Sequence, residues 1–206
     1  MKRHALIFAG GPEAGLPCLP LPEDALVLCA DSGLHLAERM GIQPDLVLGD
    51  FDSLGAVPEQ YPHLTVPVEK DDTDTLLACR TALARGCREI TVAGAFGGRL
   101  DHVLANLQTL EFLHMHGASG RLVGADDFAA LLPPGTHSLP RMTGFSLSVF
   151  SWTARCTGVC ETGVYYPLEN AVLTRDFPLG VSNRITSETA EISLQSGLLL
   201  VIGSRL

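Results

Sequence analysis

The chain has 206 residues, of which 46% are hydrophobic and 18% charged, and its formal net charge is −9. This composition is typical of a globular protein and argues against disorder, collagen-like repeats and coiled coils. An acidic chain is poorly suited to gripping nucleic-acid phosphates, so we expect no nucleic-acid partner. No run approaches the ~18–20 apolar residues of a membrane helix, so we expect a cytoplasmic protein without a membrane partner. The six cysteines include no Cys-x-x-Cys pair, and we expect reduced thiols.

Short apolar runs alternate with helix-like segments in the first part of the chain. The runs that we predict as strands are 5–9, 25–30, 46–48, 64–68, 90–95 and 121–123. Helical spacing extends over 34–42, 75–85 and 102–116, and we expect Leu100, Leu104 and Leu107 on the inner face of the last segment. This alternation predicts an α/β fold with a parallel, Rossmann-like sheet over residues 1–130.

Strand signals dominate after the Pro-Pro-Gly sequence at 133–135. Apolar and other residues alternate over 145–150 and 190–195, and a fully apolar run covers 198–202. Gly-containing turns separate these runs at short intervals. The pattern predicts a second, smaller domain over residues 131–206, an all-β sandwich or roll.

Aspartates gather where three of the predicted strands end. Asp31 follows the run 25–30, Asp50 and Asp52 follow 46–48, and Asp101 comes shortly after 90–95. Ligands of open α/β sheets bind outside the carboxyl ends of the strands. We therefore expect these side chains to converge on one crevice.

Asp50 and Asp52 are candidates for a metal site. In extended backbone their side chains would point the same way, with Phe51 turned into the core. Two such carboxylates repel each other unless a cation lies between them, and oxygen ligands favour Mg²⁺ or Mn²⁺. The alternative is a solvated loop rich in turn-forming aspartates.

The segment 70–74 precedes a predicted helix and allows two interpretations. Asp and Thr are favoured at helix N-termini, so the segment can be an N-cap cluster. In a functional interpretation, Asp74 is a further metal ligand and Lys70 or Asp71 contacts the substrate. Sequence alone leaves both open.

The segment 97–102 favours phosphate binding. Gly97 and Gly98 let the backbone pass close to a ligand, and Arg99 offers a planar fork for phosphate oxygens. Asp101 resembles a helix cap beside that arginine, and His102 suits either a phosphate contact or a helix start. Neither a Walker motif nor a complete Gly-x-Gly-x-x-Gly motif is present. These residues together predict metal-assisted phosphate chemistry on an α/β sheet.

Several segments resemble the thiamine pyrophosphokinase family, in the same order along most of the chain. Examples are the family patterns Lys-Asp-x-Thr-Asp and Gly-x-x-Gly-Gly-Arg-x-Asp-His-x-Leu-x-Asn. The segments that carry the resemblance are 30–33, 44–53, 70–74, 94–106, 163–168 and 180–183. The resemblance implies Mg²⁺-dependent transfer of a diphosphate group from ATP to the thiamine hydroxyl, giving thiamine diphosphate and AMP. It also implies a homodimer with thiamine bound near the subunit interface.

The resemblance assigns roles to individual residues. It implies that the N-terminal domain binds ATP and that Asp50, Asp52 and Asp74 hold Mg²⁺. The catalytic residues that we expect are Asp50, Asp52, Asp71, Asp74, Arg99 and Asp101, with Asp71 or Asp101 as the base for the hydroxyl proton. The residues that we expect to bind substrate are Asp31, Lys70, Thr73, Gly97, Gly98, His102, Ser182 and Asn183.

One departure from the family concerns the acceptor side of the site. Bacterial relatives usually follow the Ser-Asn pair with an acidic residue and an aromatic one, whereas this chain has Arg184 and Ile185. Ser32 also replaces a glycine of the family pattern. Three alternatives stay open. They are a pyrophosphokinase for another heterocyclic alcohol, such as a hydroxymethyl pterin; a phosphohydrolase built on Asp50 and Asp52; and a non-catalytic thiamine or nucleotide sensor.

Overall fold

The computed structural model describes residues 3–11, 16–51, 54, 57–67 and 72–206. The chain forms two compact units, Met1–Asp126 (unit 1) and Asp127–Leu206 (unit 2). Unit 1 mixes strands and helices, whereas the described elements of unit 2 are all strands.

Unit 1 contains six parallel strands in the order β6-β5-β1-β2-β3-β4. Their bounds are β1 His4–Phe8, β2 Ala25–Ala30, β3 Leu46–Gly49, β4 His63–Thr65, β5 Glu89–Ala93 and β6 Ser119–Val123. The central strands are buried almost throughout, as expected for a parallel sheet covered on both faces. The predicted mixed α/β class is confirmed.

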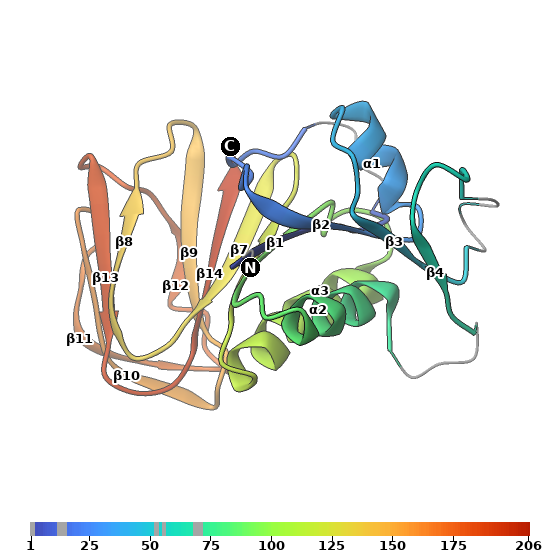
Figure 1. Cartoon of the computed structure of the whole chain (residues 1–206). Helices are drawn as coiled ribbons and strands as arrows, with labels where there is room; N and C mark the ends of the chain where they lie inside the picture. Colours follow the sequence, from blue (N-terminus) through green and yellow to red (C-terminus); the bar gives the residue numbers. More distant parts are fainter. Residues whose placement is uncertain (1–2, 12–15, 52–53, 55–56, 68–71) are drawn as a thin grey trace. The chain divides into compact units, whose positions relative to one another are not determined.

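Three helices accompany this sheet: α1 Gly33–Arg39, α2 Asp74–Ala84 and α3 Leu100–Met115. In Figure 1, α1 lies on one side of the strands and α2 and α3 on the other. Leu34, Leu36 and Ala37 of α1 pack in a buried cluster with apolar side chains of β1, β2, β3 and β5. This packing fixes the strand ends from which the site is built.

The buried face of α3 differs from the expected one. Leu100 and Leu104 are 81% and 51% exposed, and Leu107 is only partly buried. The buried residues are instead Asn106, Thr109, Leu110 and Leu113. Thr109 can be buried because its hydroxyl donates to the Ala105 carbonyl at 3.0 Å, so apolarity alone misassigned the face.

Unit 2 consists of eight strands in two antiparallel groups. Their bounds are β7 Asp127–Leu132, β8 Gly135–Pro140, β9 Phe145–Ser151, β10 Arg155–Thr162, β11 Leu168–Thr174, β12 Gly180–Asn183, β13 Thr189–Leu194 and β14 Leu199–Arg205. One group has the order β12-β9-β14-β7 and the other β11-β10-β13-β8. All the registered pairs within these groups are antiparallel.

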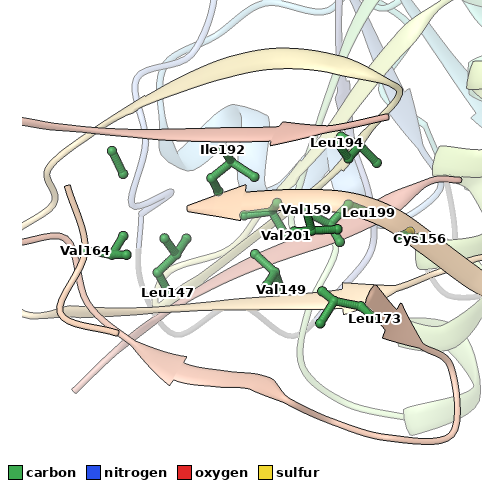
Figure 2. Packing of buried hydrophobic residues seen from close by; sticks show 11 residues of the cluster. Leu147, Val149, Cys156, Val159, Val164, Leu173, Ile192, Leu194, Leu199 and Val201 are labelled. Atoms are coloured by element: carbon green, nitrogen blue, oxygen red, sulfur yellow. The ribbon is translucent and has the colours of Figure 1, made fainter. Parts of the chain in front are cut away.

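The core of unit 2 lies between these two groups. Leu147, Val149 and Val201 come from one group, and Val159 and Ile192 come from the other. Figure 2 shows these side chains packed against one another. The predicted alternation over 145–150 and 190–195 therefore reflects one face turned to this core.

Two further expectations concern membrane-spanning helices and the state of the cysteines. No helix in the described residues is long and apolar enough to cross a membrane. No disulfide joins any of the six cysteines, all of which lie in the described ranges. Burial raises the pKa of the Cys29 and Cys79 thiols to about 12, so both stay protonated.

Candidate active site

A cavity of about 520 Å³ opens where the strands of unit 1 end. The residues expected in the site that line it are Asp31, Asp50, Thr73, Asp74, Gly97, Gly98, Arg99 and His102. They come from four separate parts of the sequence. The carboxyl ends of parallel strands thus bring together groups that are distant along the chain, as the strand–helix pattern predicts.

Asp31 lies at the end of β2 and begins the turn into α1. Its backbone N–H donates to the Leu48 carbonyl at 2.9 Å, and its own carbonyl accepts from Leu34 N–H at 3.2 Å. The residue is 7% exposed and has φ of +46°. A non-glycine residue in this region costs roughly 1–2 kcal/mol and is held there by its surroundings. The turn therefore fixes the Asp31 side chain at the cavity.

The backbone after β3 is not extended, in contrast to the expectation from the sequence. Phe51 has φ of +62°, which turns the chain immediately after Asp50. Phe51 does pack against the buried cluster of unit 1, as expected, but it reaches the cluster from a turn. Asp50 lines the cavity, and Asp52 lies outside the described residues.

The start of α2 serves both as a helix cap and as a cavity wall. The Thr73 hydroxyl accepts from Leu76 N–H at 3.2 Å, which is N-cap geometry. Thr73 and Asp74 nevertheless both line the cavity. Asp72 also lines it and forms an ion pair with Arg80 at 2.8 Å. The two interpretations of this segment are thus compatible, while Lys70 and Asp71 lie outside the described residues.

The glycine turn before α3 presents backbone to the cavity. Gly97 and Gly98 have φ of +89° and +66°, which residues with side chains rarely adopt. Arg99 follows and forms a bidentate pair with Asp101, at 3.1 Å from Nε and 2.5 Å from Nη2. The hydrogen bond from Arg99 lowers the pKa of the Asp101 carboxyl, and His102 N–H also donates to that carboxyl. Asp101 thus contacts a cavity residue rather than lining the cavity.

Sequence analysis missed several residues that line the cavity. They include Gly10, Gly11, Ser32, Asp72, Thr75 and Asn106. Gly11 could have been found, because it is a glycine that follows the first predicted strand. The structure shows why a glycine is needed there, since a Cβ would lie 2.4 Å from the Gly94 carbonyl oxygen. Asn106 donates to the Ala95 carbonyl at 2.8 Å, which ties α3 to the end of β5.

The donor chemistry of the cavity suits magnesium. No group of three acidic, histidine or cysteine side chains in the described ranges is arranged to hold a metal ion. Mg²⁺, however, is usually bound by one or two carboxylates, with phosphate and water oxygens completing its octahedron. Asp50 and Asp74 line the same cavity and meet that requirement.

The expected acceptor residues lie in unit 2, at the end of β12. Ser182 is exposed and has φ of +61°. Asn183 is 6% exposed, and its side chain bonds to Tyr166 and to Glu161. Next to it, the Arg184 guanidinium stacks over the Tyr165 ring, 4.1 Å from the ring centre.

Comparison with known proteins covers both units. The family model for the thiamin pyrophosphokinase catalytic domain matches residues 21–119, and the model for the vitamin B1 binding domain matches residues 136–199. The chain is 30% identical to thiamine pyrophosphokinase of Bacillus subtilis over 96% of its own length and 97% of the relative's length.

Solved structures agree with the sequence matches. A crystal structure of thiamine pyrophosphokinase from Bacillus subtilis superposes with a TM-score of 0.87 at 29% identity, covering 98% of this chain and 99% of the other. One from Geobacillus thermodenitrificans gives 0.83 at 27% identity, with 98% of each chain covered. With two family models and full-length relatives in agreement, the chain belongs to the thiamine pyrophosphokinase family.

Proposed function

We propose that this chain transfers a diphosphate group from ATP to the hydroxyl of thiamine, giving thiamine diphosphate and AMP. The observation that carries the proposal is a cavity of unit 1 that carboxylates, a glycine turn and an arginine line together. Membership of the family supports the substrate pair, because its two models are described as catalytic and vitamin B1 binding.

The proposal places ATP in the cavity of unit 1. ATP is an anion, and Asp31, Asp50 and Asp74 would repel it without a cation. We propose that Asp50 and Asp74, with Asp52, hold Mg²⁺, which when bound screens these charges and polarises phosphate oxygens.

Residues of the chain itself would align and stabilise the reacting groups. The backbone at Gly97 and Gly98 passes beside the phosphates, and Arg99 steadies negative charge on the transferred group. The thiamine hydroxyl attacks the β-phosphorus, the bond to the α-phosphate oxygen breaks, and AMP leaves. Alignment and charge neutralisation supply most of the rate enhancement in such transfers.

The pairing of Arg99 with Asp101 bears on the choice of base. Because this pairing lowers the pKa of the Asp101 carboxyl, Asp101 is a weaker proton acceptor in this geometry. We therefore assign Asp101 the task of orienting Arg99. Removal of the hydroxyl proton then falls to Asp71, the other candidate from the sequence.

The proposal includes a homodimer, as the family resemblance implies. Unit 2 carries large exposed apolar side chains that could contribute to an association surface. They are Val172, Phe177, Leu179 and Val181, which are between 44% and 63% exposed. Sedimentation equilibrium would test this part of the proposal, and a monomer at micromolar concentration would contradict it.

The central experiment measures AMP formation from ATP and Mg²⁺, with and without thiamine. We expect AMP to form only with thiamine, in step with thiamine diphosphate. AMP or phosphate released equally without thiamine would instead indicate a hydrolase. Release that depends on a hydroxymethyl pterin rather than thiamine would indicate a different acceptor, and binding without AMP would indicate a sensor.

A further inference from the structure

The Asn183 side chain has no hydrogen-bonding capacity left for a ligand. Its Oδ1 accepts from Tyr166 N–H at 3.0 Å and from Arg184 N–H at 2.9 Å. Its Nδ2 donates to the Tyr166 carbonyl at 2.8 Å and to Glu161 Oε2 at 3.0 Å. An amide side chain offers two donors and two acceptor positions, so all four are used within the chain. Asn183 therefore acts on a ligand through the segments that it holds.

Glu161 is the side-chain partner of that amide. The Glu161 side chain is 1% exposed, at an inward position of β10 where its strand neighbours are Leu168 and Ile192. Its Oε2 accepts from Asn183, and its Oε1 has no hydrogen-bond partner among the described residues. Burying a carboxyl among apolar side chains is unfavourable, and the hydrogen bond with Asn183 offsets part of this cost. The Glu161 acceptor thus adds to the orientation in which the Asn183 NH₂ also meets the Tyr166 carbonyl and its oxygen meets two backbone N–H groups.

Two segments depend on that orientation. One is the 163–167 loop between β10 and β11, which Asn183 holds by both polar backbone groups of Tyr166. The other is the irregular end of β12, where Ser182 has φ of +61° and its N–H donates to Ser148 Oγ at 3.1 Å. Ser182 is thus held on one side by Ser148 and on the other by the anchored Asn183. An unfavourable backbone conformation of this kind persists only where its surroundings enforce it.

We propose that Glu161 and Asn183 are a buried positioning pair, which fixes Ser182 and the 163–167 loop in the conformation that receives the acceptor alcohol. The inference rests on the proposed function, because it concerns the acceptor side of that reaction. Neither side chain of the pair touches the acceptor. Ser182, which is exposed, and Tyr166, which is 64% exposed, are the residues that the pair presents.

Steady-state kinetics on three variants of the full chain test this pair. Glu161→Leu fills the apolar position but removes the acceptor for Asn183, so we expect KM for thiamine to rise about tenfold, the loss of one hydrogen-bonded anchor. KM for ATP should stay unchanged, because neither Glu161 nor Asn183 lines the cavity in which we place ATP. Glu161→Gln keeps an acceptor oxygen and should restore KM for thiamine to within ~2-fold of the wild type.

Ile192→Val is the matched control, since it shortens a buried side chain on the strand beside Glu161 without touching a polar contact. We expect it to lower the melting temperature and leave both KM values unchanged. A wild-type KM for thiamine in Glu161→Leu would overturn the proposal. Equal increases of KM for thiamine in Glu161→Leu and Glu161→Gln would also overturn it. So would an increase of KM for thiamine in Ile192→Val, because it would show that lost stability alone raises this KM.

Amide hydrogen exchange provides a readout that does not require activity. We expect the Tyr166 and Arg184 amides to exchange faster in Glu161→Leu and at the wild-type rate in Glu161→Gln. Unchanged protection in the Leu variant would overturn the positioning role. If the wild type released AMP at the same rate with and without thiamine, the proposed function would be contradicted. The exchange result would still decide whether Glu161 holds these segments.

Discussion

The carboxylates of unit 1 and the Glu161 carboxyl of unit 2 have opposite surroundings. Asp50 and Asp74 line a cavity. Asp101 is exposed beside Arg99, and the hydrogen bond from Arg99 lowers the pKa of the Asp101 carboxyl. Glu161 is enclosed in the core of the strands, where burial raises its pKa to about 7, against an opposing effect of the Asn183 hydrogen bond. Burial thus favours the neutral form of the Glu161 carboxyl, whereas the Arg99 hydrogen bond favours the charged form of the Asp101 carboxyl.

This difference separates two kinds of contribution. Removing a cavity carboxylate should mainly change turnover, because its negative charge lines the cavity in which we place ATP and Mg²⁺. Removing the buried carboxyl should change stability and acceptor binding, because its contacts are internal. Substitutions at the two kinds of carboxyl test this separation.

The largest effect is expected from Asp50→Asn. Loss of one well-placed electrostatic group typically costs ~10²–10³ in turnover, so we expect AMP formation to fall at least ~100-fold with a nearly unchanged melting temperature. Turnover should be measured at saturating Mg²⁺ and ATP, to exclude a simple loss of affinity. Near-normal turnover under these conditions would remove Asp50 from the metal site.

A comparable effect, on stability rather than turnover, is expected from the pKa of Glu161. A rise from 4.5 to about 7 corresponds to roughly 3 kcal/mol at most. The folded form binds this proton more tightly than the unfolded chain does, so the stability is fully present below pH 4.5 and is lost as the pH rises to about 7. Urea unfolding of the wild type and of Glu161→Gln should therefore diverge across this window, with the variant gaining relative stability. Parallel curves would show that Glu161 titrates normally.

Arg99→Ala should have a smaller kinetic effect. A charge-assisted hydrogen bond contributes roughly 1.5–2 kcal/mol, so we expect kcat to fall ~10–30-fold and KM for thiamine to change little. Arg85→Ala is a suitable control, because Arg85 is exposed at the C-cap of α2, the opposite end from the cavity residues Thr73 and Asp74. A variant at Arg99 that loses only thiamine affinity would contradict its role in the chemical step.

The smallest effect is expected at the N-cap of α2. Thr73→Ala removes the hydroxyl that accepts from Leu76 N–H and should lower the free energy of unfolding by about 1 kcal/mol. Thr73→Ser keeps the hydroxyl and should recover that loss. Thermal unfolding compares the two, and equal stability of both variants would show that the cap contributes nothing.

Much of unit 1 could be predicted because strand–helix alternation fixes where a parallel sheet presents its ligands. The groups around Asp31, Asp50 and Gly97 meet at one cavity for that reason. The turn at Phe51 could not be predicted, because a positive φ at a non-glycine residue is imposed by tertiary contacts. The buried face of α3 was also misjudged, since Thr109 and Asn106 satisfy their polar groups internally.

Unit 2 shows a different limit. Alternation predicts which apolar side chains face its core, and the structure agrees for Leu147 and Ile192. It cannot predict that Glu161 occupies an equivalent inward position, because that depends on one amide partner 22 residues further along the chain. The expected boundary after residue 130 lies within β7, whose residues after Asp127 are all apolar.

The stacking of Arg184 on Tyr165 has a consequence for any positively charged acceptor. A ring face can accommodate a single cation at a time, and in this chain the guanidinium already occupies it. A thiazolium could stack on the same face only by displacing the Arg184 guanidinium. Shortening the Arg184 side chain would therefore expose this face of Tyr165, where a cationic ring could stack in its place.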